Sequence, residues 1–406
     1  AYGVVMITTK RGVEGKGKLS FSANYAIQHA SNMPDLLNAA QYAELSNDMM
    51  MNSGRNPNPE WANPASLGQG TDWMDALLGT GTMETYTVSY SGGGEKYNYY
   101  VSAGFLSQKG IVNNQGYRRY TFQSNTDAKV FDWLKFSNNI TFSADQKDSG
   151  SYNIGDALKA LPVQTIKDAN GEWSGPEGNS EWYGSIRNPL GTTEMNKSKT
   201  NGYNLLANMT AELTFTKWLK FKSTFGYDAK FWYSKAFTPK YNWKPTPVEQ
   251  SSRFQSSDKS FTYLWDNYFV FDHTFAEKHH VGVMAGTSAQ WNEYDFMSGQ
   301  KNVFLFDSVN QLGNGLEMYS LNGNQSDWSL LSYMARFNYS YADRYLVTAT
   351  VRRDGSSRFG KNNRWGTFPS VSLAWRVSEE SWFRKSNWLN DLKIRAGYGI
   401  TGSQDG

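Results

Sequence analysis

Residues 219–231, LKFKSTFGYDAKF, carry the pattern that decides the fold. Apolar and polar side chains alternate along this stretch, as they do along a β-strand whose two faces meet different surroundings. One face carries Leu219, Phe221, Phe225, Tyr227, Ala229 and Phe231. The other face carries Lys220, Lys222, Thr224, Asp228 and Lys230. A strand of this kind separates lipid from water, as in the wall of a membrane β-barrel.

The same alternation recurs along the rest of the chain, for example in residues 134–145 and 345–354. Counted from residues 18–28 onward, about thirteen segments of about ten residues show it. A run of roughly 18 apolar residues is absent from the sequence, so a membrane-spanning helix is not expected.

The connections between these segments alternate between tight turns and longer loops. Tight turns are expected at residues 92–95, 127–132, 215–217, 276–278, 342–344 and 378–387. Long connections are expected at residues 30–81, 146–200, 232–260, 293–327 and 355–364, and parity places the short 109–116 connection with them. A two-sheet sandwich or a propeller also has alternating strands, but it has no reason to sort its connections in this way. The pattern favours an up-and-down barrel with turns at one end and loops at the other.

Aromatic and helical segments support this arrangement. Tryptophan precedes leucine at Trp133, Trp218 and Trp388, each time after a predicted short turn and at the start of an outward-running strand. We expect these rings at one level, in an interfacial aromatic girdle. Residues 36–51 predict an amphipathic helix and residues 156–161 one helical turn, both within long loops at the loop end.

The composition excludes several classes of protein. The 406 residues carry 40 Lys+Arg against 37 Asp+Glu, a balance that excludes a strongly basic nucleic-acid binder. Cysteine is absent, which excludes disulfide scaffolds, thiolate metal sites and cysteine nucleophiles.

Short motifs that suggest chemistry have simpler interpretations. Residues 168–171, DANG, begin like a calcium loop but lack the later ligands, so a surface turn is expected. His273, His279 and His280 lie beside a predicted turn and are interpreted as solvated residues rather than metal ligands. Residues 92–94, GGG, predict a hairpin turn rather than a phosphate cradle. We expect no catalytic residues, no metal and no cofactor, since no catalytic motif can be assembled.

Aromatic residues in the predicted loops are the best candidates for ligand contact. They are Trp173, Trp182, Tyr183, Trp232, Tyr233, Tyr241 and Trp243. Sugar rings stack on such flat faces, but the same rings can instead pack the loops against each other or against a capping protein. Basic residues on the polar face could line a route through the barrel, hydrate its wall or contact a plug; they are Lys220, Lys222, Lys230, Arg336, Arg352 and Arg395.

Several motifs, in order, resemble one family. They are AYGVVMITTKRG at residues 1–12, TDW at 71–73, SGGGEKYNY at 91–99, GIV at 110–112 ahead of GYRRY at 116–120, RDGSSRFG at 353–360 and LKIRAGYG at 392–399. Together they span nearly the whole chain and resemble the SusC/RagA-like TonB-dependent outer-membrane transporters of Bacteroidetes.

This resemblance implies an all-β, antiparallel, up-and-down transmembrane barrel, of which the chain would supply about thirteen of about 22 strands, with short helices in extracellular loops. It implies that residues 1–12 are the last strand of the plug domain and that residues 13–406 are the N-terminal part of the barrel. It also implies location in a Gram-negative outer membrane and energy-coupled import of large nutrients, either glycan oligosaccharides or peptides. The implied partners are a SusD-like surface lipoprotein, and TonB through a missing N-terminal region.

Two other classes remain open from the residues alone. A secreted or surface carbohydrate-binding β-protein would use the aromatics as a platform without crossing a membrane. An outer-membrane enzyme barrel would need a catalytic constellation that the sequence does not present.

Overall fold

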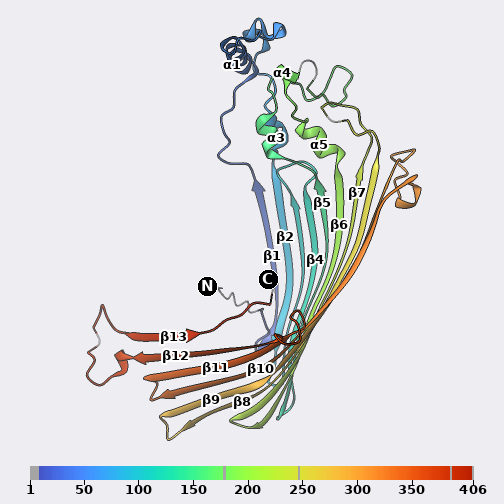
Figure 1. The fold of residues 1–406 in the computed structure, drawn as a ribbon. Coiled ribbons are helices and arrows are strands. Elements are labelled where there is room, and N and C mark those ends of the chain that lie inside the picture. The colour runs from blue at the N-terminus through green and yellow to red at the C-terminus, as the bar shows by residue number, and fades with distance from the viewer. Residues whose placement is uncertain (1–8, 177–179, 246, 385, 405–406) are drawn as a thin grey trace.

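The computed structural model describes residues 9–176, 180–245, 247–384 and 386–404. In these ranges thirteen antiparallel strands form one sheet, paired in the order in which they follow along the chain. The strands are β1 Gly15–Gln28, β2 Gly81–Gly93, β3 Tyr97–Lys109, β4 Gly116–Phe131, β5 Leu134–Gly150, β6 Lys197–Thr216, β7 Leu219–Thr238, β8 Ser252–Phe275, β9 His279–Asn302, β10 Glu317–Tyr341, β11 Tyr345–Ser356, β12 Trp365–Arg376 and β13 Lys393–Gly399. Figure 1 shows a curved wall with helices gathered at one end. The predicted number and order of strands are confirmed.

Most strands are longer than the segments of about ten residues in which alternation is visible. β7 has 20 residues and β10 has 25. The connection predicted at residues 232–260 is therefore wrong in its bounds, because only residues 239–251 lie between β7 and β8. The connections expected at 146–200 and 293–327 likewise shorten to 151–196 and 303–316. Backbone pairing between neighbours does not require an apolar face, so the ladder continues where alternation has faded.

Tight turns occupy one end of the sheet, as predicted. The turns at residues 276–278 and 342–344 occur at the expected positions, and residues 94–96 form the glycine-rich hairpin turn. Ala276 and Glu277 have φ of 46° and 60°. Two consecutive left-handed residues match the right-handed twist of a hairpin, which explains the short connection.

Three expectations at this turn end are wrong. The turn expected at residues 215–217 lies at residues 217–218, because β6 continues to Thr216. β4 continues to Phe131, so Asp132 and Trp133 alone connect it to β5 instead of a turn over residues 127–132. The turn expected at residues 378–387 is a longer connection, residues 377–392. Trp388 therefore lies inside this connection rather than at the start of β13, whereas Trp133 and Trp218 directly precede β5 and β7 as predicted.

Glu380 attaches the first part of the last connection to the sheet. Its Oε1 accepts hydrogen bonds from the Tyr345 hydroxyl at 2.6 Å and from Trp375 Nε1 at 3.0 Å. Its Oε2 lies 3.0 Å from Arg344 Nη1. These bonds attach the connection to β11, β12 and the preceding turn.

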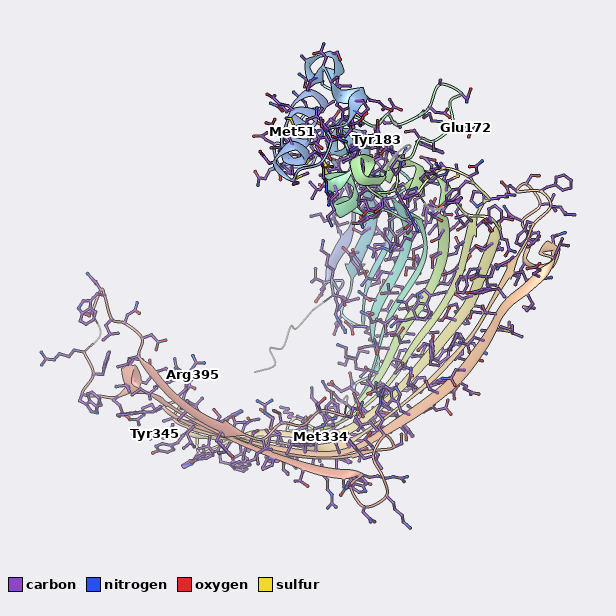
Figure 2. All side chains as sticks on the ribbon, turned by 45° about the horizontal axis from the view of Figure 1, so that its top comes forward. Met51, Glu172, Tyr183, Met334, Tyr345 and Arg395 are labelled. Atoms are coloured by element: carbon purple, nitrogen blue, oxygen red, sulfur yellow. The ribbon has the colours of Figure 1, made fainter. Side chains whose placement is uncertain are left out.

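The two faces of the sheet differ as the alternation predicts. On one face aromatic rings of neighbouring strands stack, with centroids 6.3 Å apart for Tyr227 and Phe261 and 4.8 Å apart for Tyr263 and Trp291. Residues paired across a ladder share a face, so register carries this assignment from strand to strand. Figure 2 shows Tyr345, from the aromatic face, on the convex side and Arg395, from the polar face, on the concave side. The polar face is therefore the inner wall.

Helices occur mainly in the loops at the other end, the loop end. They are α1 Ala39–Asn52, α2 Trp73–Leu77, α3 Ile154–Lys159, α4 Ser180–Tyr183 and α5 Pro189–Met195, with short 3-10 turns η1 Pro59–Trp61, η2 Pro64–Leu67, η3 Leu312–Asn314 and, at the turn end, η4 Val377–Glu379. The helix predicted at residues 36–51 begins instead at Ala39, because Asn38 and Gln41 form a reciprocal capping box. The helical turn predicted at residues 156–161 is present as α3, which begins after its Asn153 cap.

A small apolar core joins the loops. Trp73, Met74 and Leu77 of α2 pack with Val112 and Ala157, and all five are buried. Trp73 Nε1 also donates a 2.8 Å hydrogen bond to the Leu161 carbonyl. The loop end is thus a packed layer supported by the sheet.

Among the described residues the sheet does not close on itself, because β1 pairs only with β2 and β13 only with β12. None of the helices in the described ranges has the length and apolar content needed to cross a membrane.

Opposite-face substitutions on β7 test the assignment of the two faces. In the full-length protein, Phe225→Arg places a charge on the convex face, where we expect a loss of about 2–4 kcal/mol of folding free energy in lipid. Thr224→Arg, one residue away on the inner wall, should cost about 1 kcal/mol, mainly through its lost hydrogen bond to Thr210. Urea titration of the protein folded in liposomes measures both values, and equal losses would contradict the assignment.

Candidate functional site

The inner wall holds the segment that leads into β1. Residues 9–12 lack regular secondary structure and lie against β4 and β5. Asn139 Nδ2 donates to Thr9 Oγ1 at 2.8 Å, and Asn125 Nδ2 donates to the Lys10 carbonyl at 2.6 Å. Arg11 Nη1 lies 2.7 Å from Asp127 Oδ1. Three consecutive residues are therefore bound by polar side chains of the wall, and we call this contact the N-terminal anchor.

Asp127 is the centre of the N-terminal anchor. Besides Arg11, its Oδ1 accepts a 2.5 Å hydrogen bond from Ser137 Oγ and lies 3.5 Å from Lys135 Nζ. Its side chain is only 12% exposed, so loss of these partners would leave a poorly hydrated carboxylate.

Glycine at position 12 allows the N-terminal segment to lie close to the backbone of β2 and β3. A Cβ there would meet the Tyr99 carbonyl oxygen and lie 2.6 Å from the Gly92 carbonyl oxygen. Both atoms belong to the backbone of the sheet and cannot move aside easily. Most of the strand predicted at residues 1–12 lies outside the described residues, and its described part, 9–12, is this anchored segment.

Charges on the inner wall are largely paired. Lys220 and Lys222 lie 2.9 and 2.8 Å from the two carboxylate oxygens of Glu212. Lys230 pairs with Asp228 at 2.8 Å. Of the other basic residues expected on this face, Arg352 pairs with Asp354 and donates to Ser332, and Arg336 donates to Asn338. The wall is hydrated with little unbalanced charge.

Five of the seven predicted ligand-contact aromatics lie in the loops, and three of these five, Trp173, Tyr241 and Trp243, pack around α5 or on each other. Tyr241 stacks on Trp243 with centroids 4.6 Å apart. Trp243 and Trp173 both lie against Gly191 of α5, where a Cβ would be 3.0 and 3.2 Å from their rings. Lys167 Nζ lies 4.4 Å above the Trp173 ring.

Tyr183 of α4 packs edge-on against Trp61 at 5.5 Å and donates a hydrogen bond to Glu60. Burial, together with this contact to Glu60, raises the pKa of Tyr183, so the phenol stays neutral and can donate. The indole nitrogen of Trp182 is buried and has no hydrogen-bond partner in the described part of the chain.

Trp232 and Tyr233 lie in β7 rather than in a loop. Tyr233 accepts a hydrogen bond from Gln255, and Lys235 Nζ lies 4.8 Å from its ring. Trp232 is paired across the ladder with Asp258, so its side chain lies on the inner wall, on the same face as Asp228 and Lys230. The seven predicted aromatics therefore form several separate contacts instead of one platform.

The sequence did not single out the N-terminal anchor. Arg11 and Asp127 are 116 residues apart, and only the register of β4 and β5 brings Asn125, Asp127 and Asn139 to one place. The only local feature of the sequence that points to the N-terminal anchor is a carboxylate on the polar face of a strand.

The motifs that resemble metal sites behave as turns and wall residues. Asp168 Oδ1 accepts hydrogen bonds from the backbone of Asn170 and Glu172, which makes a local turn as predicted. His279 contacts the Tyr339 hydroxyl and His280 lies 3.4 Å from Asp272. A cluster of three or more potential metal ligands does not occur in the described ranges.

A two-faced antiparallel sheet with polar residues inside, aromatic residues outside and a packed loop layer defines a class of protein, the transmembrane β-barrel. The family model described as "TonB dependent receptor-like, beta-barrel" matches residues 132–402, and the chain belongs to this family of outer-membrane proteins.

Curated relatives include TonB-dependent receptor P3 of Formosa agariphila, 30% identical over 99% of this chain and 40% of that protein. TonB-dependent receptor SusC of Bacteroides thetaiotaomicron is 29% identical over 99% of this chain and 41% of its own length. Among solved structures, the RagAB peptide transporter matches 98% of this chain and 49% of its own chain, with a TM-score of 0.83 and 22% identity. These findings confirm the SusC/RagA-like resemblance, and the chain spans about 40% of these curated relatives.

Removal of the Asp127 carboxylate tests the N-terminal anchor. Asp127→Ala in the full-length protein should release residues 9–12 more often, because the ion pair and the Ser137 bond disappear. Arg11 is half exposed, so we expect about 1 kcal/mol, or about fivefold faster trypsin cleavage after Lys10 and Arg11.

Glu212→Ala is the matched control, since it removes another paired wall carboxylate without contact to the anchor. Mass spectrometry of the fragments measures the rates. Equal cleavage in the parent protein and Asp127→Ala would show that the ion pair does not hold the segment.

Proposed function

We propose that the chain forms part of the wall of an energy-coupled importer of large nutrients, which works with TonB. Residues 1–12 are proposed as the last plug strand and residues 13–406 as the N-terminal part of the barrel. The observation that carries this proposal is the N-terminal anchor, since it holds the chain on the inner wall directly before β1. A chain entering β1 from inside the barrel suits a plug that precedes it.

The two edges of the sheet support the assignment to part of a barrel. β1 and β13 each leave one side of their backbone without a ladder partner in the described residues. Lipid cannot satisfy such groups, so further strands must pair with them in the membrane. The relatives, which are more than twice as long as the matched region, have length for additional strands.

We propose glycan oligosaccharides as the nutrient class, with peptides as the alternative. Trp232, which is 36% exposed on the inner wall, can stack against a sugar ring. The RagAB protein is described as a peptide transporter, and this keeps peptides in the test.

The proposed partner at the loop end is a SusD-like surface lipoprotein. Leu45, Met49 and Met51 of α1 are each more than half exposed, which gives that end an apolar surface. Methionine-rich surfaces adapt to protein partners. The TonB contact is proposed for an N-terminal region of the full-length protein that is missing from this sequence.

Uptake in cells tests the proposed function. Deletion of the gene should lower uptake of fluorescent neutral hexasaccharides at least about tenfold, and the full-length gene should restore it, because molecules of this size pass general pores poorly. A protonophore should abolish the restored uptake. Labelled hexapeptides serve as the alternative cargo. Uptake unaffected by the protonophore would contradict an energy-coupled importer.

A further inference from the structure

A row of side chains crosses the inner wall just below the loop end. Ladder pairing links Arg119 of β4 to Asp145 of β5, Asp145 to Gly202 of β6, and Gly202 to Trp232 of β7. Paired residues share a face, so all four lie on the concave side. Neighbouring strands are about 4.8 Å apart, which places Trp232 about 14 Å from Arg119 along the row.

Arg119, Asp145 and Trp232 of this row line a hollow of about 230 Å³. Gly202 accommodates the Asp145 side chain, since a Cβ there would lie 2.6 Å from Asp145 Oδ1. The Asp145 carboxylate therefore lies over the backbone of β6, on the side toward Trp232. The other residues that line the hollow are Tyr117, Ser143, Tyr203, Asn204 and Lys230.

The two charged side chains of the row have no side-chain partner among the described residues. In the described part of the chain Arg119 and Asp145 have neither an ion pair nor a side-chain hydrogen bond, unlike Lys230, which pairs with Asp228. Asn204 Oδ1 is buried and lacks a hydrogen-bond partner among the described residues. Trp232 is 36% exposed. The hollow thus combines a free cation, a free carboxylate and a partly exposed indole ring.

The chemistry of these groups favours a sugar. A hydroxyl both donates and accepts, so adjacent hydroxyls can donate to Asp145 and accept from Arg119. An aromatic face next to them suits the apolar side of a sugar ring. A ligand with one net charge would be attracted by either Arg119 or Asp145 and repelled by the other, so a neutral ligand fits best.

The backbone argues against an extended peptide. Peptides commonly bind sheets by adding a strand at a free edge. β4, β5, β6 and β7 are each paired on both sides, so the hollow offers no free edge. A ligand in the hollow must therefore be recognised by side chains. Sugar hydroxyls can form hydrogen bonds with side chains in this way.

We propose that this hollow is a neutral-oligosaccharide contact site, in which a sugar ring stacks on Trp232 while its hydroxyls, or those of the next ring, bond to Arg119 and Asp145. This inference rests on the proposed import function and names a binding site for it. The site would be a binding site on the inner wall, which the transported oligosaccharide reaches after it has passed the loops.

Calorimetric titration of the full-length protein in detergent tests the site, with cellohexaose, mannohexaose and xylohexaose as probes and a tryptic casein digest for comparison. The parent protein should bind at least one hexasaccharide. Trp232→Ala should raise its Kd about tenfold, because the stacking face is lost. Trp232→Phe keeps a flat ring and should remain within about threefold.

Asp145→Asn keeps the shape of the side chain but removes an anionic acceptor, and it should raise the Kd about fivefold. Phe231→Ala is the matched control, since Phe231 is the preceding residue of β7 and lies on the opposite face. It should leave the Kd unchanged. Each variant must first show the urea resistance of the parent protein.

Unchanged hexasaccharide binding in Trp232→Ala and Asp145→Asn would overturn the site while leaving import intact. Binding of casein peptides but of no hexasaccharide by the parent protein would overturn the sugar assignment. The import proposal fails by a different result, namely that uptake in cells does not respond to the protonophore.

Discussion

The hydrogen-bond ladder between neighbouring strands is the constraint on which the structure depends. Lipid offers no partner to a backbone N–H or C=O, so a strand in the membrane must be paired along both sides. β1 to β13 meet this requirement by pairing consecutively and antiparallel, except at the two outer edges of the sheet. Because the backbone supplies cohesion, the side chains of each face are free to suit lipid or water.

This division explains which parts of the fold the sequence could predict. Strand number, order and the two faces follow from local alternation, as in residues 219–231, and each was confirmed. Strand ends were not predictable, since β7 reaches Thr238 because a neighbour continues beside it. The connection at residues 377–392 depends on Glu380 and on partners up to 36 residues away.

The candidate site was less predictable because its contacts are not local. The sequence shows that aromatic residues are concentrated in the long loops, but not that Trp173 and Trp243 meet at Gly191. It cannot place Arg11 beside Asp127 without the register of the intervening strands. Trp232 was selected as an aromatic loop residue, and its position in β7 changes its neighbours from loop residues to the polar wall.

Charge pairing gives the inner wall a property suited to the proposed transport. Glu212 with its two lysines, and Asp228 with Lys230, keep the surface hydrated while presenting little net charge to a passing solute. A pathway needs contacts strong enough to admit a solute and weak enough to release it. Shallow, unpaired positions such as Arg119 and Asp145 fit this need better than a deep pocket would, since a ligand held by exposed side chains of a rigid wall can exchange them for water as it moves on.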